Sequence, residues 1–85
     1  MDPCFSVVSV DVYRGVTMKS VVKAHTADLA RDSFEAVFAV ERFVVEEVRR
    51  TIELELDHLF EDGTSLRELV TAVEFGVVAW TTDLE

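Results

Sequence analysis

The chain has 85 residues, of which 49% are apolar, and a formal net charge of −9 at pH 7. This length allows one domain with one hydrophobic core, and the apolar fraction excludes an intrinsically disordered chain. Direct binding to DNA or RNA is disfavoured, because affinity for phosphate depends on clustered Lys and Arg, and here seventeen acidic residues outnumber eight basic ones. We therefore expect a single small acidic domain spanning residues 1–85.

The acidity is uneven along the chain. Residues 1–25 carry a net charge of +1, whereas residues 26–85 carry −10. Such a balance either keeps the protein soluble or attracts a basic partner, for example by mimicking nucleic acid in front of a nucleic-acid-binding protein. Charge alone leaves both interpretations open.

Cysteine use and hydropathy indicate the compartment. Cys4 is the single cysteine, so no intrachain disulfide can form. The N-terminus lacks the basic and apolar regions of a secretory leader, and no window of about 18 residues is free of charge. We expect a cytoplasmic protein that does not span a membrane.

The first 25 residues predict a β-hairpin. Residues 5–13 and 16–25 both alternate β-branched apolar with polar side chains, and residues 14–15 form a short turn between them. Lys19 and Lys23 are expected on one solvated face, where lysine also discourages edge-to-edge aggregation.

A long amphipathic helix is expected next. Asp32 is the favoured N-cap, ahead of Thr26, because Glu35 follows three residues later as in a capping box. Steps of 100° per residue place an apolar series on one narrow arc, which predicts a helix over residues 33–60. The series consists of Phe34, Phe38, Val45, Val48, Ile52, Leu56 and Leu59.

The length of this helix raises a geometric conflict. Twenty-eight residues would span about 42 Å, whereas a compact domain of this size is roughly 30 Å across. One solution is a break at residues 49–51, followed by a third strand over residues 51–57, where apolar and acidic side chains alternate. The other is a continuous helix whose overhang is covered by another chain.

The last third of the chain predicts a second helix. Gly63 ends the preceding element, and Ser65 with Glu68 forms a capping box that starts a helix running to about Glu74. Residues 75–80 suit either a helical extension or a short last strand, since Gly76 weakens a helix. The fold class is therefore α+β, in the order ββαβα with the last strand as an addition.

No catalytic constellation is expected. Glu55 and His58 have the Glu-x-x-His spacing of di-iron helices, but such a site needs a second motif and two further glutamates. His25 and Cys4 lack neighbouring partners in the sequence. We expect no enzyme activity, no metal and no cofactor.

Two functions are compatible with these features. The first is a protein–protein interaction module, for instance a viral or mobile-element inhibitor of a basic nucleic-acid-handling protein. Its contact residues would be Trp80 and the acids Glu53, Glu55, Asp57, Glu61 and Asp62. The second is a homo-oligomeric accessory subunit of a larger complex. Its dimer seam would be the apolar helix face of Val45, Val48, Ile52, Leu56 and Leu59.

A short motif supports the second function. The six residues from Asp62 to Arg67 read Asp-Gly-Thr-Ser-Leu-Arg. They resemble the entry into the last helix of the small dimerising subunit of the tRNA-threonylcarbamoylation (KEOPS) complex. The resemblance implies a dimeric subunit, while residues 70–73 and the N-terminal hairpin depart from that family's pattern.

Overall fold

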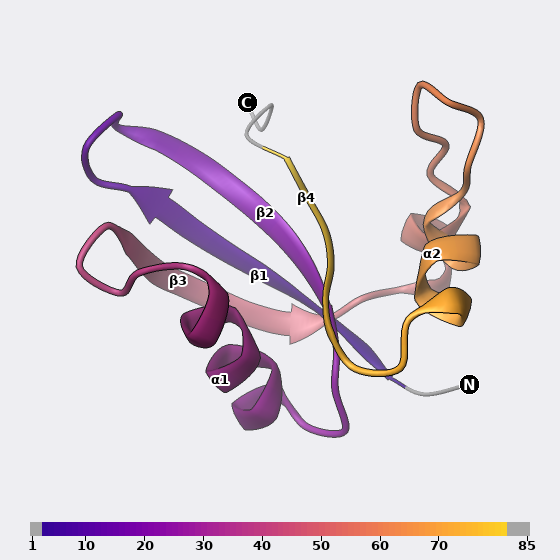
Figure 1. Ribbon diagram of the computed structural model, residues 1–85, viewed down its shortest axis with the longest axis horizontal. Coiled ribbons are helices and arrows are strands. Elements are labelled where there is room, and N and C mark those ends of the chain that lie inside the picture. The colour runs from indigo at the N-terminus through magenta and orange to yellow at the C-terminus, as the bar shows by residue number, and fades with distance from the viewer. Residues whose placement is uncertain (1–2, 82–85) are drawn as a thin grey trace.

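The structure, a computed structural model, describes residues 3–81, with side chains up to residue 78. Its elements form one four-stranded antiparallel sheet in the order β3-β1-β2-β4, together with helices on both faces (Figure 1). The elements are β1 (Cys4–Asp11), β2 (Val16–Lys23), α1 (Ala27–Val37), β3 (Phe43–Arg50), the 3₁₀ helix η1 (Glu53–Asp57), α2 (Leu66–Ala72) and β4 (Gly76–Thr81). The predicted α+β class is confirmed.

The predicted hairpin of β1 and β2 is confirmed and forms the centre of the sheet. Its strands pair from Cys4 opposite Lys23 to Asp11 opposite Val16. Gly15 closes the turn with a positive φ of 66° and donates its N–H to the Asp11 carbonyl at 2.7 Å. Glycine adopts this backbone region without the steric cost that a side chain brings.

The helix after the hairpin begins earlier and ends much earlier than the sequence predicts. Thr26, not Asp32, is the N-cap, and its hydroxyl accepts a hydrogen bond from the Leu29 N–H at 3.2 Å. The helix ends at Val37 and residues 43–50 form a strand, so both alternatives are wrong: the helix that breaks at residues 49–51 and the continuous helix over residues 33–60. The molecule extends only 32 Å along its longest axis, which is too short to contain that helix.

The third strand exists but lies upstream of the predicted position. β3 occupies residues 43–50 and pairs with β1, whereas residues 53–57 form η1 instead of a strand. A β-bulge at Val8 and Ser9 leaves Glu46 without a partner on β1. The bulge lets Val45 and Val48, three positions apart, both pack against the core beneath α1.

Two apolar clusters lie on opposite faces of the sheet. α1 covers the first face, and the buried members of that cluster are Phe5, Val7, Met18, Val22, Ala24, Ala30 and Phe34. η1 and α2 cover one end of the second face, and the buried members of that cluster are Cys4, Val21, Leu56, Leu66 and Val70. Each face therefore has its own core, whereas the length of the chain predicted a single one.

The last two elements follow the predictions closely. Ser65 caps α2 by accepting a hydrogen bond from the Glu68 N–H at 3.1 Å, and the helix ends at Ala72, slightly before the predicted Glu74. The last strand, β4, is present and pairs with β2. Neither of the two described α-helices combines the length and the apolar content that a membrane crossing requires.

Candidate interaction surface

The acids of the predicted contact patch mostly have intramolecular partners. Glu55 lies at the centre of a charge network that joins β2, β3 and η1. It accepts hydrogen bonds from Arg49 at 2.7 and 2.9 Å, from the Lys19 Nζ at 2.5 Å and from the Ile52 N–H at 3.1 Å. Arg49 is the largest influence and, with Lys19, lowers the pKa of Glu55 to about 2.

Three further acids of this series are held by neighbours of η1 and α2. Arg67 on α2 donates to Glu53 at 3.0 Å and to Asp57 at 3.3 Å, and these bonds raise the pKa of the guanidinium. Asp62 accepts the N–H of Thr64 at 2.9 Å, which lowers its pKa. Glu61 is exposed and has no ion pair within residues 3–81.

The other predicted contact residues are dispersed. Trp80 lies on β4 opposite Ser20, but its side chain is outside the described part of the structure. The predicted dimer seam is not one helix face, because its residues belong to β3, η1 and the flanking segments. Leu56 is buried beneath α2, while Ile52 and Leu59 are exposed.

Lys23 was predicted on a solvated face, and this is wrong. Its side chain is buried and its Nζ donates to the carbonyl oxygens of Val70 at 2.8 Å and Val73 at 2.7 Å. Those carbonyls end α2, where a cation is favoured by the helix dipole and by the missing intrahelical donors. Lys23 therefore fastens the C-terminal end of α2 to the sheet.

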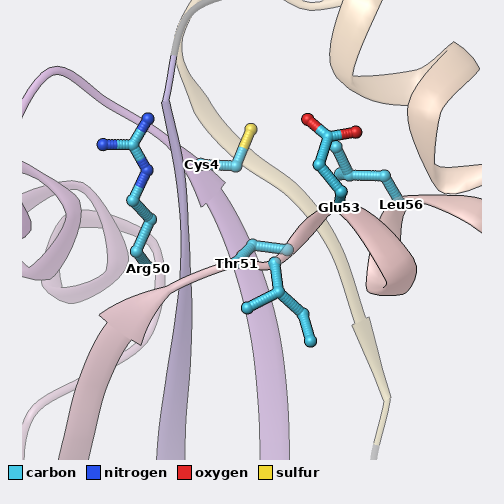
Figure 2. Close-up of a pocket in the computed structure, with 6 residues that line it drawn as sticks. Cys4, Arg50, Thr51, Glu53 and Leu56 are labelled. Atoms are coloured by element: carbon cyan, nitrogen blue, oxygen red, sulfur yellow. The ribbon is translucent and has the colours of Figure 1, made fainter.

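A cavity of about 400 Å³ opens where β3 leaves the sheet (Figure 2). Its lining residues are Cys4, Arg50, Thr51, Ile52, Glu53 and Leu56. Figure 2 shows the Arg50 guanidinium and the Glu53 carboxylate on opposite sides of the Cys4 thiol. No histidine is among the described residues that line the cavity.

The two histidines lie against aromatic rings. His25 is 4.6 Å from Phe75 and His58 is 5.0 Å from Phe60, measured between ring centroids. In the part of the chain that the structure describes, no group of three or more His, Cys, Asp or Glu side chains is arranged to hold a metal ion.

One exposed apolar surface of the described residues lies on the second face of the sheet. Val8 and Val10 alternate with the core-facing side chains of β1, and Val44 on β3 is the partner of Val10. Val12 follows in the turn, where its N–H donates to the Arg42 carbonyl at 2.9 Å. We call Val8, Val10, Val12 and Val44 the bare stripe.

The end of the bare stripe at Val12 and Val44 is left exposed by η1 and α2. Figure 1 shows α2 near the start of β1 and far from the β1–β2 turn. Val12 and Val44 keep 49% and 48% of their surface exposed, and Val8 and Val10 are half-buried. Contiguous exposed apolar side chains of this kind mark contact sites more often than isolated ones do.

An anchored turn holds one end of the bare stripe in place. The Asp11 carboxylate accepts two hydrogen bonds from Arg42, at 3.0 and 2.9 Å, and further bonds from the N–H groups of Tyr13 and Arg14. Arg42 is the main cause of the lowered pKa of Asp11. The guanidinium also lies over the rings of Tyr13 and Phe43, 5.3 and 5.2 Å from their centroids.

The bare stripe was not among the sites predicted from the sequence, although apolar and polar side chains alternate over residues 8–12. An alternating strand specifies that one set of side chains faces a core, but not whether a second layer covers the other set. Comparisons of the chain with protein-family models, curated proteins and solved structures gave no match.

Proposed function

We propose that this chain is a non-enzymatic protein–protein interaction module whose partner docks on the bare stripe. The observation that supports this function is the row of valines on the second sheet face, exposed at Val12 and Val44, beside the part of that face that η1 and α2 cover. A sheet face of this type stabilises an association when a second apolar layer covers it. The turn anchored by Asp11 and Arg42 offers the partner a preorganised surface.

The charges around the bare stripe favour a basic partner. Glu47 is paired with Val8, and Glu41 precedes the anchored Arg42. Both carboxylates are exposed and have no ion pair within residues 3–81, although Glu47 also interacts electrostatically with Arg49. Exposed carboxylates attract a basic surface over long range, and this attraction weakens with salt.

The proposed contact therefore differs from the acidic series at residues 53–62. Most of those acids already bind Lys19, Arg49 or Arg67. A basic protein that handles nucleic acid would fit this surface. This chain would then act as an inhibitor of that protein, of viral or mobile-element origin. The buried Cys4 thiol is compatible with action in a reducing compartment such as the cytoplasm.

The test compares three immobilised proteins: the wild type, Val44→Lys on the bare stripe and the control Val37→Lys. Val37 is 62% exposed at the end of α1, where an added cation is also tolerated by the helix dipole. We expect a basic protein to bind the wild type and Val37→Lys. The same protein should not bind Val44→Lys. Circular dichroism must show that all three proteins are folded.

Direct affinity measurements complete the test. The captured protein, once purified, should bind the wild type less tightly as salt increases, because screening weakens the attraction to Glu41 and Glu47. Equal capture by all three folded proteins, or a partner that binds independently of salt, would show that the function or its surface is wrongly assigned.

A further inference from the structure

β3 is an edge strand. It pairs with β1 alone, and within residues 3–81 no strand lies on its outer side. The N–H of Thr51 donates to the Cys4 carbonyl at 2.8 Å, so position 51 is turned towards β1. Because this orientation alternates along a strand, the N–H and C=O groups of Val48 and Arg50 point outward. The Arg50 carbonyl accepts a long hydrogen bond from the exposed Arg49 guanidinium, at 3.3 Å, which a second strand must replace before β3 extends the ladder there.

The charges of β3 are arranged as mirror opposites about Val48. From Glu46 to Arg50 the strand reads acid, acid, valine, base, base. If a second β3 pairs antiparallel about a twofold axis at Val48, position 46 lies opposite 50 and position 47 lies opposite 49. Every charge then faces an opposite charge, which favours pairing.

The alternative twofold registers are less favourable. Side chains opposite each other must lie on the same face, so the axis passes through a residue. An axis at Glu46 or Glu47 places a glutamate opposite its own copy, and an axis at Arg49 or Arg50 does the same with arginine. Like charges directly opposite one another are destabilising. Among the central five positions, Val48 is the one axis that avoids this.

The outer charges of this set are available for pairing. Glu46 and Arg50 are exposed and have no ion pair in the described part of the chain. The bulge also leaves Glu46 without a partner on β1. Arg49 is less available, because it already binds Glu55 through two hydrogen bonds. Self-association would thus add two ion pairs to each dimer. Each pair joins position 46 of one copy to position 50 of the other.

We propose that two copies of this chain associate through β3, antiparallel and centred on Val48, so that their sheets join into one continuous sheet. This goes beyond docking on the bare stripe, since it assigns the sheet edge and a second copy of the chain. The twofold axis is perpendicular to the joined sheet, so both α1 helices lie on one face and both bare stripes on the other. A dimer would then offer a partner two stripes instead of one.

Charge reversal provides a direct test. Mass is measured by light scattering after size exclusion in low salt, where the wild type should have about twice the 9.6 kDa of one chain. Glu46→Arg and Arg50→Glu each turn both 46–50 contacts into repulsions, and each should raise the dimer dissociation constant by about tenfold or more. Mixing the two variants should restore the dimer, because each 46–50 contact again joins opposite charges.

The control is Glu41→Arg, which reverses an exposed charge outside β3 and should leave the mass of the dimer unchanged. Circular dichroism must show that every variant is folded. A wild type that remains monomeric at millimolar concentration overturns the proposal. So does a Glu46→Arg protein that still dimerises like the wild type, or a mixture of the two variants that stays monomeric.

Discussion

The Glu55 network offers the sharpest test of how η1 is held to the sheet. Glu55→Gln keeps the size of the side chain but removes its charge and replaces one acceptor oxygen by a donor. Arg49 and Lys19 then face an amide that can no longer accept all of their hydrogen bonds. We expect the folded state to lose stability without a change of fold.

The magnitude follows from the acidity of the carboxyl group. Its pKa falls from 4.5 to about 2 on folding, and this interval corresponds to about 3 kcal/mol of preference for the ionised form. Arg49 and Lys19 keep 38% and 25% of their side-chain surface exposed, so water screens part of this interaction. We expect Glu55→Gln to lower the free energy of unfolding by about 1–2 kcal/mol at pH 7.

The pH dependence has a defined sign. Folding lowers the pKa of Glu55, so its contribution is complete above pH 4.5 and is lost as the pH falls towards 2. The difference between the wild type and Glu55→Gln should therefore be constant near neutral pH. It should shrink steadily between pH 4.5 and about 2, because the wild-type carboxyl becomes protonated there.

Urea unfolding followed by circular dichroism measures both quantities. Glu53→Gln is the matched control, since Glu53 also belongs to η1 but keeps 78% of its side-chain surface exposed. It should change the free energy of unfolding by less than about 0.5 kcal/mol. The reasoning is refuted if Glu55→Gln is as stable as Glu53→Gln at pH 7, or if its deficit persists unchanged at pH 2.

Three further substitutions test other contacts by the same unfolding measurement. Ser20→Ala should be neutral or stabilise by about 1 kcal/mol, since the buried Ser20 hydroxyl has no hydrogen-bond partner among the side chains that the structure describes. Ser6→Ala should instead cost about 1 kcal/mol, because the Ser6 hydroxyl is hydrogen-bonded to that of Thr51 at 2.8 Å. Lys23→Met should cost about 2 kcal/mol and speed amide hydrogen exchange in α2, and unchanged exchange there would contradict its role as a helix fastener.

Local signals predicted much of the fold. The hairpin could be predicted because alternation and a short turn are encoded within neighbouring residues. The start of α2 could be predicted because Ser65 and the first turn of the helix are close in sequence. The position of β3 could not, since a bulge lets Val45 and Val48 share a face with the three-residue spacing of a helix. Pairing with β1 makes residues 43–50 a strand instead of a helix. This pairing joins residues far apart in the sequence, so a local pattern does not predict it.

The candidate site was harder to predict for the same reason. Lys19 is 36 residues from Glu55, and Lys23 is 47 residues from Val70, so the sequence gives no local sign of either contact. In the sequence, the acids of residues 53–62 look like an exposed patch. The structure shows that most of them bind basic side chains from other elements. The bare stripe becomes visible once α1 and α2 have been assigned to particular parts of the sheet.

The strand order β3-β1-β2-β4 also constrains how the chain reaches its native state. Both outer strands dock on the hairpin, and each arrives only after a helical segment has been traversed. Closing the short turn between β1 and β2 costs little loop entropy, while an isolated hairpin is only marginally stable. The folding nucleus should therefore consist of the hairpin with α1, and β4 should join late. During synthesis the sheet can be completed only after residues 76–81, which form β4, have been added.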